Sequence, residues 1–244
     1  MKGASNGALR LSLIYALHKT GLYGVLDGCR DYAKLATMAK RQSFSQFGED
    51  LFLRSYFGDR QGLYIDIGGN HPFRLSNTYL LYRMGWKGLV VEPIRKLYVK
   101  HRRLRPRDIQ INAAVSDRTG DLTFYQMIPP VLSTCDPKEV EKMLSSGSAL
   151  LLHKYSVPTT TVAELYRTHL APRPISLLSI DTEGYDMAVL RGVDWEEMNP
   201  EIVICEANDK GLREETYHFL AGHGYKCLKV LGCNLIFTNV RHAQ

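Results

Sequence analysis

The sequence predicts an α/β fold: a seven-stranded, mostly parallel sheet with helices on both faces, ending in an antiparallel hairpin. From residue 63 onward, short apolar runs alternate with longer amphipathic runs, the pattern of strands joined by crossover helices. The first five runs are mostly apolar without a regular polar alternation, which is typical of strands buried on both faces. The last two runs are separated only by a short loop around Gly232, which is the spacing of a hairpin.

Each expected element follows from one of these runs. The expected strands span residues 63–67, 88–92, 109–115, 175–181, 201–207, 225–230 and 234–240. The expected helices span residues 76–84, 94–104, 185–191 and 212–222.

The chain reads as one domain with an N-terminal extension. Residues 1–42 show leucines at helical spacing and predict a helical extension, and residues 43–244 form the main domain. An insertion over 121–174 contains a strand, a short helix, and a second strand running into a helix that begins at Thr160 or Thr161. Insertions near the carboxyl ends of strands shape ligand pockets, and we expect this one to do so.

The N-terminal extension has four readings. An amphipathic helix usually packs on its own domain; the alternatives are a homodimer contact and a helix lying on a membrane surface. A short secretion signal is a fourth alternative, but no small-residue cleavage site follows it.

Composition fits a soluble globular protein in a reducing compartment. The 244 residues are 45% hydrophobic, and no run approaches the length of a membrane span. The five cysteines form no C-x-x-C pair, which favours a cytoplasmic location. The net charge of +6 fits an acidic partner. We expect no nucleic-acid partner, however, because the basic run over 100–108 reads as a solvated helix face and aromatic base-stacking motifs are missing.

Four acids stand at the ends of expected strands: Asp66, Glu92, Asp181 and Glu206. Ligands of open α/β sheets bind beyond the carboxyl ends of the strands, so this edge is the expected site. Glu92 ends the second strand, and an acid there accepts hydrogen bonds from both ribose hydroxyls while repelling a 2′-phosphate.

The loop after the first strand excludes the common phosphate-binding motifs. Residues 68–73 read GGNHPF, which matches neither G-x-G-x-x-G nor a P-loop. Asp66, two residues before the glycines, disfavours a pyrophosphate and suits a ligand with a positive group.

Several motifs in the same order resemble the FkbM family of S-adenosylmethionine (SAM)-dependent methyltransferases. They are "SQFGEDLFL", "DIGGN…SNT…GWKGLVVEP", "NAAVSD" and "SIDTEGYDMAVLRGVD", and the resemblance covers residues 43–238. It implies the Rossmann-like class I methyltransferase fold and SAM as cofactor.

The resemblance also implies roles for named residues. Asp66, Gly68 and Asn70 would lie against the methionine part of SAM, and Asp181 would contact the cofactor as well. Glu92 would hold the ribose. Asn112 and Ala113 would edge the adenine, with Ser116 and Asp117 nearby.

Methyl transfer to a hydroxyl also needs a route for the proton. Asp181 is the expected base, and His71 is the alternative. Asp181, Glu206 and Asn208 offer oxygen ligands for Mg²⁺, although Asp181 has the alternative role of binding the cofactor's amino group, and Glu183 that of capping the next helix.

The expected function is O-methylation of a small-molecule or glycan acceptor, a carbohydrate or a secondary metabolite. The alternatives are an NAD-dependent oxidoreductase or epimerase, and a catalytically silent relative that binds a cofactor or a glycan.

Overall fold

The structure is a computed structural model that describes residues 41–241. The expected N-terminal helical extension, with its membrane or dimer contact, therefore lies outside the described residues except for positions 41 and 42. The described chain divides into two compact units. The main unit contains residues 43–123 and 156–241, and the described part of the smaller unit contains residues 41–42 and 124–155.

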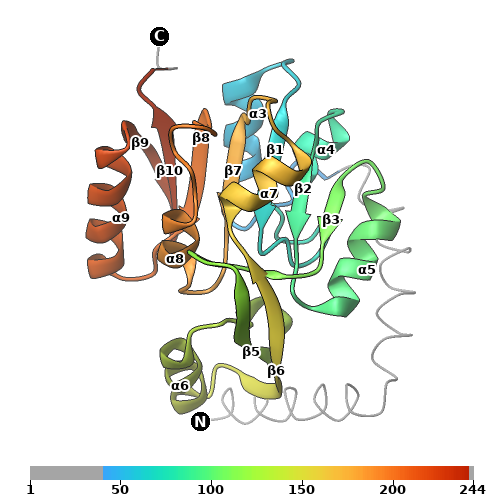
Figure 1. Ribbon diagram of the computed structural model, residues 1–244, viewed down its shortest axis with the longest axis vertical. Coiled ribbons are helices and arrows are strands. Elements are labelled where there is room, and N and C mark those ends of the chain that lie inside the picture. The colour runs from blue at the N-terminus through green and yellow to red at the C-terminus, as the bar shows by residue number, and fades with distance from the viewer. Residues whose placement is uncertain (1–40, 242–244) are drawn as a thin grey trace. The chain divides into compact units, whose positions relative to one another are not determined.

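The main unit is built on a seven-stranded sheet in the order β3-β2-β1-β7-β8-β10-β9 (Figure 1). Neighbouring strands are parallel except where β10 pairs with β8 and with β9. The expected sheet, with its closing hairpin, is thus confirmed. The strands are β1 (Leu63–Ile67), β2 (Lys87–Val91), β3 (Ile109–Ile111), β7 (Leu177–Ile180), β8 (Ile202–Glu206), β9 (Tyr225–Leu231) and β10 (Asn234–Asn239).

Helices cover both faces of this sheet, as alternation along β1 shows. Ile65 and Ile67 point into a core that also contains buried side chains of α7, α8 and α9. Tyr64 and Asp66 point to the opposite face, where they contact residues next to α4 and α5. The helices are α3 (Glu49–Phe57), α4 (Tyr79–Arg83), α5 (Arg95–Leu104), α7 (Val162–His169), α8 (Asp186–Arg191) and α9 (Lys210–Gly222).

The strand expected over 109–115 is two strands in two sheets. β3 stays in the main sheet, whereas β4 (Ala114–Val115) pairs with the end of β6 in a three-stranded sheet of order β4-β6-β5. The break falls at Asn112, whose side-chain amide donates to two backbone carbonyls that follow β2, at 2.8 and 2.9 Å. A side chain engaged with the neighbouring strand's end fixes where the chain leaves the sheet.

The expected elements of the insertion are present. They are β5 (Gly120–Ile128), a 3₁₀ turn η2 (Pro130–Leu132), α6 (Pro137–Ser146) and β6 (Leu150–Thr160). The smaller unit has its own apolar cluster, of Met127, Val140, Met143 and Ala149. In the main unit, α7 begins after Thr161, as predicted.

Within residues 41–241, no helix is both long enough and apolar enough to cross a membrane.

Candidate active site

The sheet's strand order reverses between β1 and β7, and the loop after β1 lies at this point. The N–H groups of Gly68 and Gly69 both donate to the Val91 carbonyl, at 3.0 and 3.1 Å. Gly68 has a φ of +78°, and a Cβ there would lie 1.9 Å from the Asp181 carbonyl oxygen. A Cβ on Gly69 would lie 2.3 Å from a methyl carbon of Val90. Both glycines are therefore required by contacts within the protein.

Glu92, predicted to hold the ribose, lies beside two other residues predicted to bind the cofactor, Asn70 and Asn112. The Glu92 carboxyl group is buried, and it accepts the backbone N–H of Ile94 at 2.6 Å and that of Asn70. Burial raises the pKa of Glu92 to about 8. Asn112 holds the turn that carries Glu92 through the two carbonyl contacts described above. A carboxyl group has lone pairs left after two such bonds, so Glu92 can still accept from a ribose.

Asp66 is buried beside the start of α4, and its carboxylate contacts other side chains of the protein. It accepts the Thr78 hydroxyl at 2.5 Å and lies 3.9 Å from a guanidinium nitrogen of Arg105. Burial raises its pKa, although the Arg105 charge opposes the shift. Contact between Asp66 and the methionine part of a cofactor stays a prediction.

His71 is buried within the loop that follows the two glycines. Its Nδ1 accepts the Phe73 N–H at 3.4 Å, and its ring meets the Phe73 ring edge-on at 4.5 Å between centroids. Only 6% of His71 is exposed. Its role as a base stays a prediction, which this burial does not favour.

Three carboxylates meet at the ends of β7 and β8. Asp181, Glu183 and Glu206 each place a carboxylate oxygen within 4.8 Å of the others. Asp186, at the start of α8, ties these ends together by accepting the Thr182 hydroxyl at 2.7 Å and the Glu206 N–H at 2.9 Å. Burial, followed by the charges of Glu206 and Asp186, raises the pKa of Asp181 well above its ordinary value.

Two of the three predicted metal ligands belong to this cluster, and the role of Asn208 stays a prediction. Asp181 and Glu206 share the cluster, whereas Asn208 is exposed beyond β8. Glu183 was weighed from the sequence as a helix cap, but the residue at the N-cap of α8 is Tyr185. Glu183 supplies the third carboxylate of the cluster instead.

Sequence reasoning missed two further residues beside this cluster. The Cys233 thiol, in the β9–β10 turn, hydrogen-bonds to Glu206, and burial raises the pKa of Cys233 to about 12. Glu49, at the start of α3, is fully buried, and after burial and the nearer carboxylates it also raises the pKa of Asp181. Both come from segments far away in the sequence, so no local pattern places them here. The quoted "SQFGED" motif was the available signal for Glu49.

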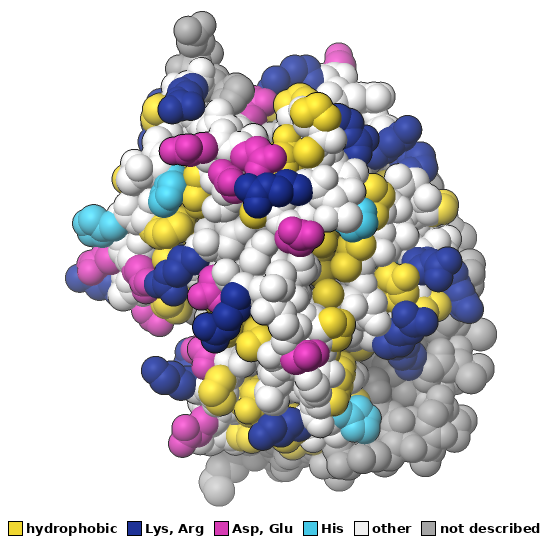
Figure 2. All heavy atoms as spheres, in the orientation of Figure 1, with side chains coloured by type: hydrophobic (Ala, Val, Ile, Leu, Met, Phe, Trp, Pro, Cys, Tyr) yellow, Lys and Arg dark blue, Asp and Glu magenta, His cyan; other side chains and the backbone are white. Residues whose placement is uncertain are grey.

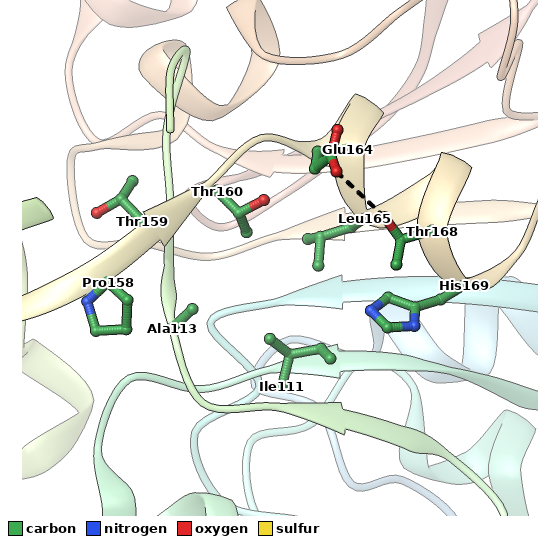
Figure 3. Close-up of a pocket in the computed structure, with 9 residues that line it drawn as sticks. All are labelled: Ile111, Ala113, Pro158, Thr159, Thr160, Glu164, Leu165, Thr168 and His169. Atoms are coloured by element: carbon green, nitrogen blue, oxygen red, sulfur yellow. Dashed lines mark hydrogen bonds between the residues drawn. The ribbon is translucent and has the colours of Figure 1, made fainter. Parts of the chain in front are cut away.

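An open pocket of about 200 Å³ lies beside the edge strand β3 (Figure 3). Its apolar side is formed by Ile111, Ala113 and Leu165, and Thr168 donates to Glu164 across its rim at 3.3 Å. Hydrophobic side chains gather along this part of the face shown in Figure 2. Of the predicted cofactor residues, Ala113 lines this pocket; its contact with adenine stays a prediction.

Solved structures with similar folds are remote from this chain. A TehB-like SAM-dependent methyltransferase from Corynebacterium glutamicum is 9% identical, with a TM-score of 0.45 over 87% of this chain and 96% of that one. A precorrin-6y C5,15-methyltransferase from Geobacter metallireducens is 10% identical, with a TM-score of 0.39 over 82% and 90%. An O-methyltransferase from Bacillus cereus in complex with SAH is 14% identical, with a TM-score of 0.37 over 84% and 86%.

No curated protein matches the chain. The Methyltransferase FkbM domain, by contrast, matches residues 66–227, more than half of the chain, from Asp66 through the carboxylate cluster and into β9. This match sets aside the alternative of an NAD-dependent oxidoreductase or epimerase. The chain therefore belongs to the FkbM methyltransferase family, and it is a SAM-dependent methyltransferase.

Proposed function

We propose that this methyltransferase transfers the methyl group of SAM to a hydroxyl oxygen of a carbohydrate or a secondary metabolite. The observation that carries the proposal is the carboxylate of Asp181 at the end of β7, whose pKa is raised by burial and by Glu206 and Asp186. A general base works best when its pKa lies near the operating pH, and an ordinary aspartate is too weak a base for an alcohol.

The residues of the β1–β2 edge fit the cofactor. Glu92 presents a buried carboxyl group with unused lone pairs, which suits the two ribose hydroxyls. Asn70 and Asn112 hold that carboxyl group and its turn in place. SAM, when bound, supplies a methyl group on a positively charged sulfur. The acids at the strand ends favour a positive charge there.

Asp181 has two tasks in this proposal. It accepts the proton of the acceptor hydroxyl, and with Glu206 it surrounds the acceptor side with negative charge. Positioning contributes as well, because fixing nucleophile and electrophile in line supplies about 7–11 kcal/mol.

A divalent cation fits the same cluster. Asp181, Glu183 and Glu206 offer oxygen ligands of the kind that Mg²⁺ prefers, and a cation would offset the repulsion between them. Bound there, Mg²⁺ would lower the pKa of the acceptor hydroxyl. The base role of Asp181 does not require it, so the experiment below includes a chelator.

The test is methyl transfer from isotopically labelled SAM to a panel of sugars, phenols and matched amines, with EDTA or with added Mg²⁺. We expect label on oxygen, and a loss of about 10²–10⁴-fold in kcat for Asp181→Asn. Glu196→Gln is the control, because Glu196 is an exposed acid. Label on nitrogen or carbon, or full activity of Asp181→Asn, would contradict the proposal. A chain that binds SAM but transfers to nothing would be the silent relative.

A further inference from the structure

Two fully buried basic side chains lie at the C-terminal end of α5, His101 in its last turn and Arg105 at its C-cap. His101 and Arg105 lie one helical turn apart, and both are 0% exposed. The prediction that residues 100–108 form a solvated helix face is therefore wrong for these two. It holds for Arg102 and Arg103, and Figure 2 shows Lys and Arg side chains gathered at the edge where α5 lies.

The His101 imidazole contacts the backbone of the loop that follows β1. Its Nε2 lies 3.3 Å from the Gly69 carbonyl oxygen and 3.0 Å from that of Asn70. Both partners can only accept, so Nε2 carries the proton and donates to both. Burial, followed by the Arg105 charge, lowers the pKa of His101 to about 3, so the ring is neutral in the cell.

Arg105 contacts the next part of the same loop. Its guanidinium donates to the Pro72 carbonyl at 3.4 Å and to the Thr78 hydroxyl at 3.0 Å. Thr78 in turn donates to Asp66, the penultimate residue of β1. The guanidinium thus connects both ends of the loop between β1 and α4.

The Arg105 guanidinium is itself fixed to the sheet. It donates to Asp108 at 2.7 Å and to the Tyr64 hydroxyl at 2.7 Å. Asp108 also accepts the Tyr64 hydroxyl at 2.6 Å and the Gly88 N–H at 3.1 Å. These contacts anchor the end of α5 to β1 and β2, so the guanidinium has a rigid support.

The loop's own sequence suits this arrangement. A Cβ on Gly69 would lie 3.3 Å from His101 Nε2 and 2.3 Å from Val90, so glycine is what lets the ring approach. Asn70 has a φ of +41° and is held on both sides: its carbonyl accepts from His101 and its N–H donates to Glu92. The His101 imidazole and the Glu92 carboxyl group therefore hold the backbone of the same residue, Asn70.

We propose that His101 and Arg105 are positioning residues that hold the loop over residues 69–72 in the shape that receives the cofactor. The inference rests on the assignment of this loop to SAM under the proposed function. Neither side chain needs to touch the cofactor. A loop already held in its binding shape loses less conformational entropy on binding. The contacts of His101 and Arg105 therefore raise the affinity for the cofactor.

The test compares His101→Leu with His101→Gln. Leucine removes the donor, whereas the glutamine amide can donate to the same carbonyls without titrating. The control is Arg103→Ala, on the exposed side of α5. Calorimetry with SAH, the demethylated product of SAM, is run at a temperature where thermal melts show every variant to be folded. This separates affinity from stability.

We expect His101→Leu to raise the Kd for SAH about tenfold or more, a shift of about 1.4 kcal/mol. We expect His101→Gln to stay within about threefold of the unmodified chain. With an acceptor in hand, the KM for SAM should rise while kcat at saturating SAM is kept. An unchanged Kd for a folded His101→Leu would overturn the proposal. Failure of the unmodified chain to bind SAH would instead overturn the proposed function.

A second measurement does not depend on any variant folding. Hydrogen exchange of the unmodified, ligand-free chain should show the Asn70 N–H protected before SAH is added, because His101 and Arg105 already order the loop. Exchange of that amide at the rate of an open chain, with protection appearing only on SAH binding, would overturn the proposal.

Discussion

Asn234 donates a 2.7 Å hydrogen bond to Glu49 across 185 positions of sequence, and it thereby joins the closing hairpin to the start of α3. Both side chains are buried, and Glu49 also accepts the Phe47 N–H at 2.9 Å. A buried carboxylate depends on such donors, since an unpaired buried charge is costly. The β9–β10 turn and the segment before α3 are therefore held beside the carboxylate cluster by one amide.

Asn234→Ala should destabilise the protein by about 1–3 kcal/mol, because it leaves the Glu49 carboxylate without its amide donor. The free energy of unfolding from urea denaturation measures this. Asn208→Ala removes an exposed asparagine and should change stability by less than about 0.5 kcal/mol. Equal stability of Asn234→Ala and the unmodified chain would show that Glu49 does not need this bond.

Glu92→Gln should change how the stability of the ligand-free chain depends on pH. The folded pKa of about 8 lies above the ordinary value of 4.5, so the folded state holds this proton more tightly than the unfolded state. The contribution of Glu92 is complete below pH 4.5 and is lost as pH rises through 8. Relative to the unmodified chain, Glu92→Gln should therefore be more stable at pH 9 than at pH 5.

Cofactor binding gives Glu92→Gln a second readout. Glutamine offers one acceptor oxygen where the carboxylate offers two, so the Kd for SAH should rise as stability at high pH improves. Urea titrations at pH 5 and pH 9, with calorimetry at pH 8, test both effects. A parallel pH dependence of the variant and the unmodified chain would mean that Glu92 ionises normally.

His101→Gln should show the opposite pH behaviour. The folded pKa of His101, about 3, lies below its ordinary 6.5, because of burial and then the neighbouring Arg105, with His71 acting in the same direction. The contribution of His101 is present above pH 6.5 and is lost as pH falls toward 3. His101→Gln should lose less stability than the unmodified chain between pH 6.5 and 4, as measured by urea denaturation.

Gly68→Ala should be strongly destabilising. The new Cβ would lie 1.9 Å from the Asp181 carbonyl oxygen, and the φ of +78° strains any L side chain. We expect a loss well above the ~1 kcal/mol cost of strain alone. Gly211→Ala, in α9, meets only Asp209 at 3.4 Å and should be neutral or stabilising by up to about 1 kcal/mol. Thermal melts of the two variants decide, and equal melting temperatures would show that β1 and β7 can separate at this point.

The sheet, its hairpin and the helix start at Thr161 could be predicted because apolar periodicity and capping are local signals. The break at Asn112 could not, since it depends on carbonyls of a different strand. The burial of His101 and Arg105 was missed because charged residues are usually solvated. A signal for it existed: together with the buried Leu97 they occupy positions i, i+4 and i+8, which is one face of α5.

The proximity of two site residues could also be predicted from the sequence. Acids at the ends of strands meet because the carboxyl ends of parallel strands share an edge, so Asp181 and Glu206 were placed correctly beside each other. Glu183, the third carboxylate of the cluster, was weighed only as a helix cap, because the path of a loop beyond a strand depends on contacts such as those of Asp186.

The side chain of Asn112 also separates two kinds of sequence change. It fixes the turn that carries Glu92 and, at the same point, ends β3 before the chain continues to β4 and the insertion. Residues 124–155 form a compact unit with an apolar cluster of their own. The two side-chain hydrogen bonds that fix the turn at Glu92 are made by Asn112 alone, so a replacement within residues 124–155 should leave them in place.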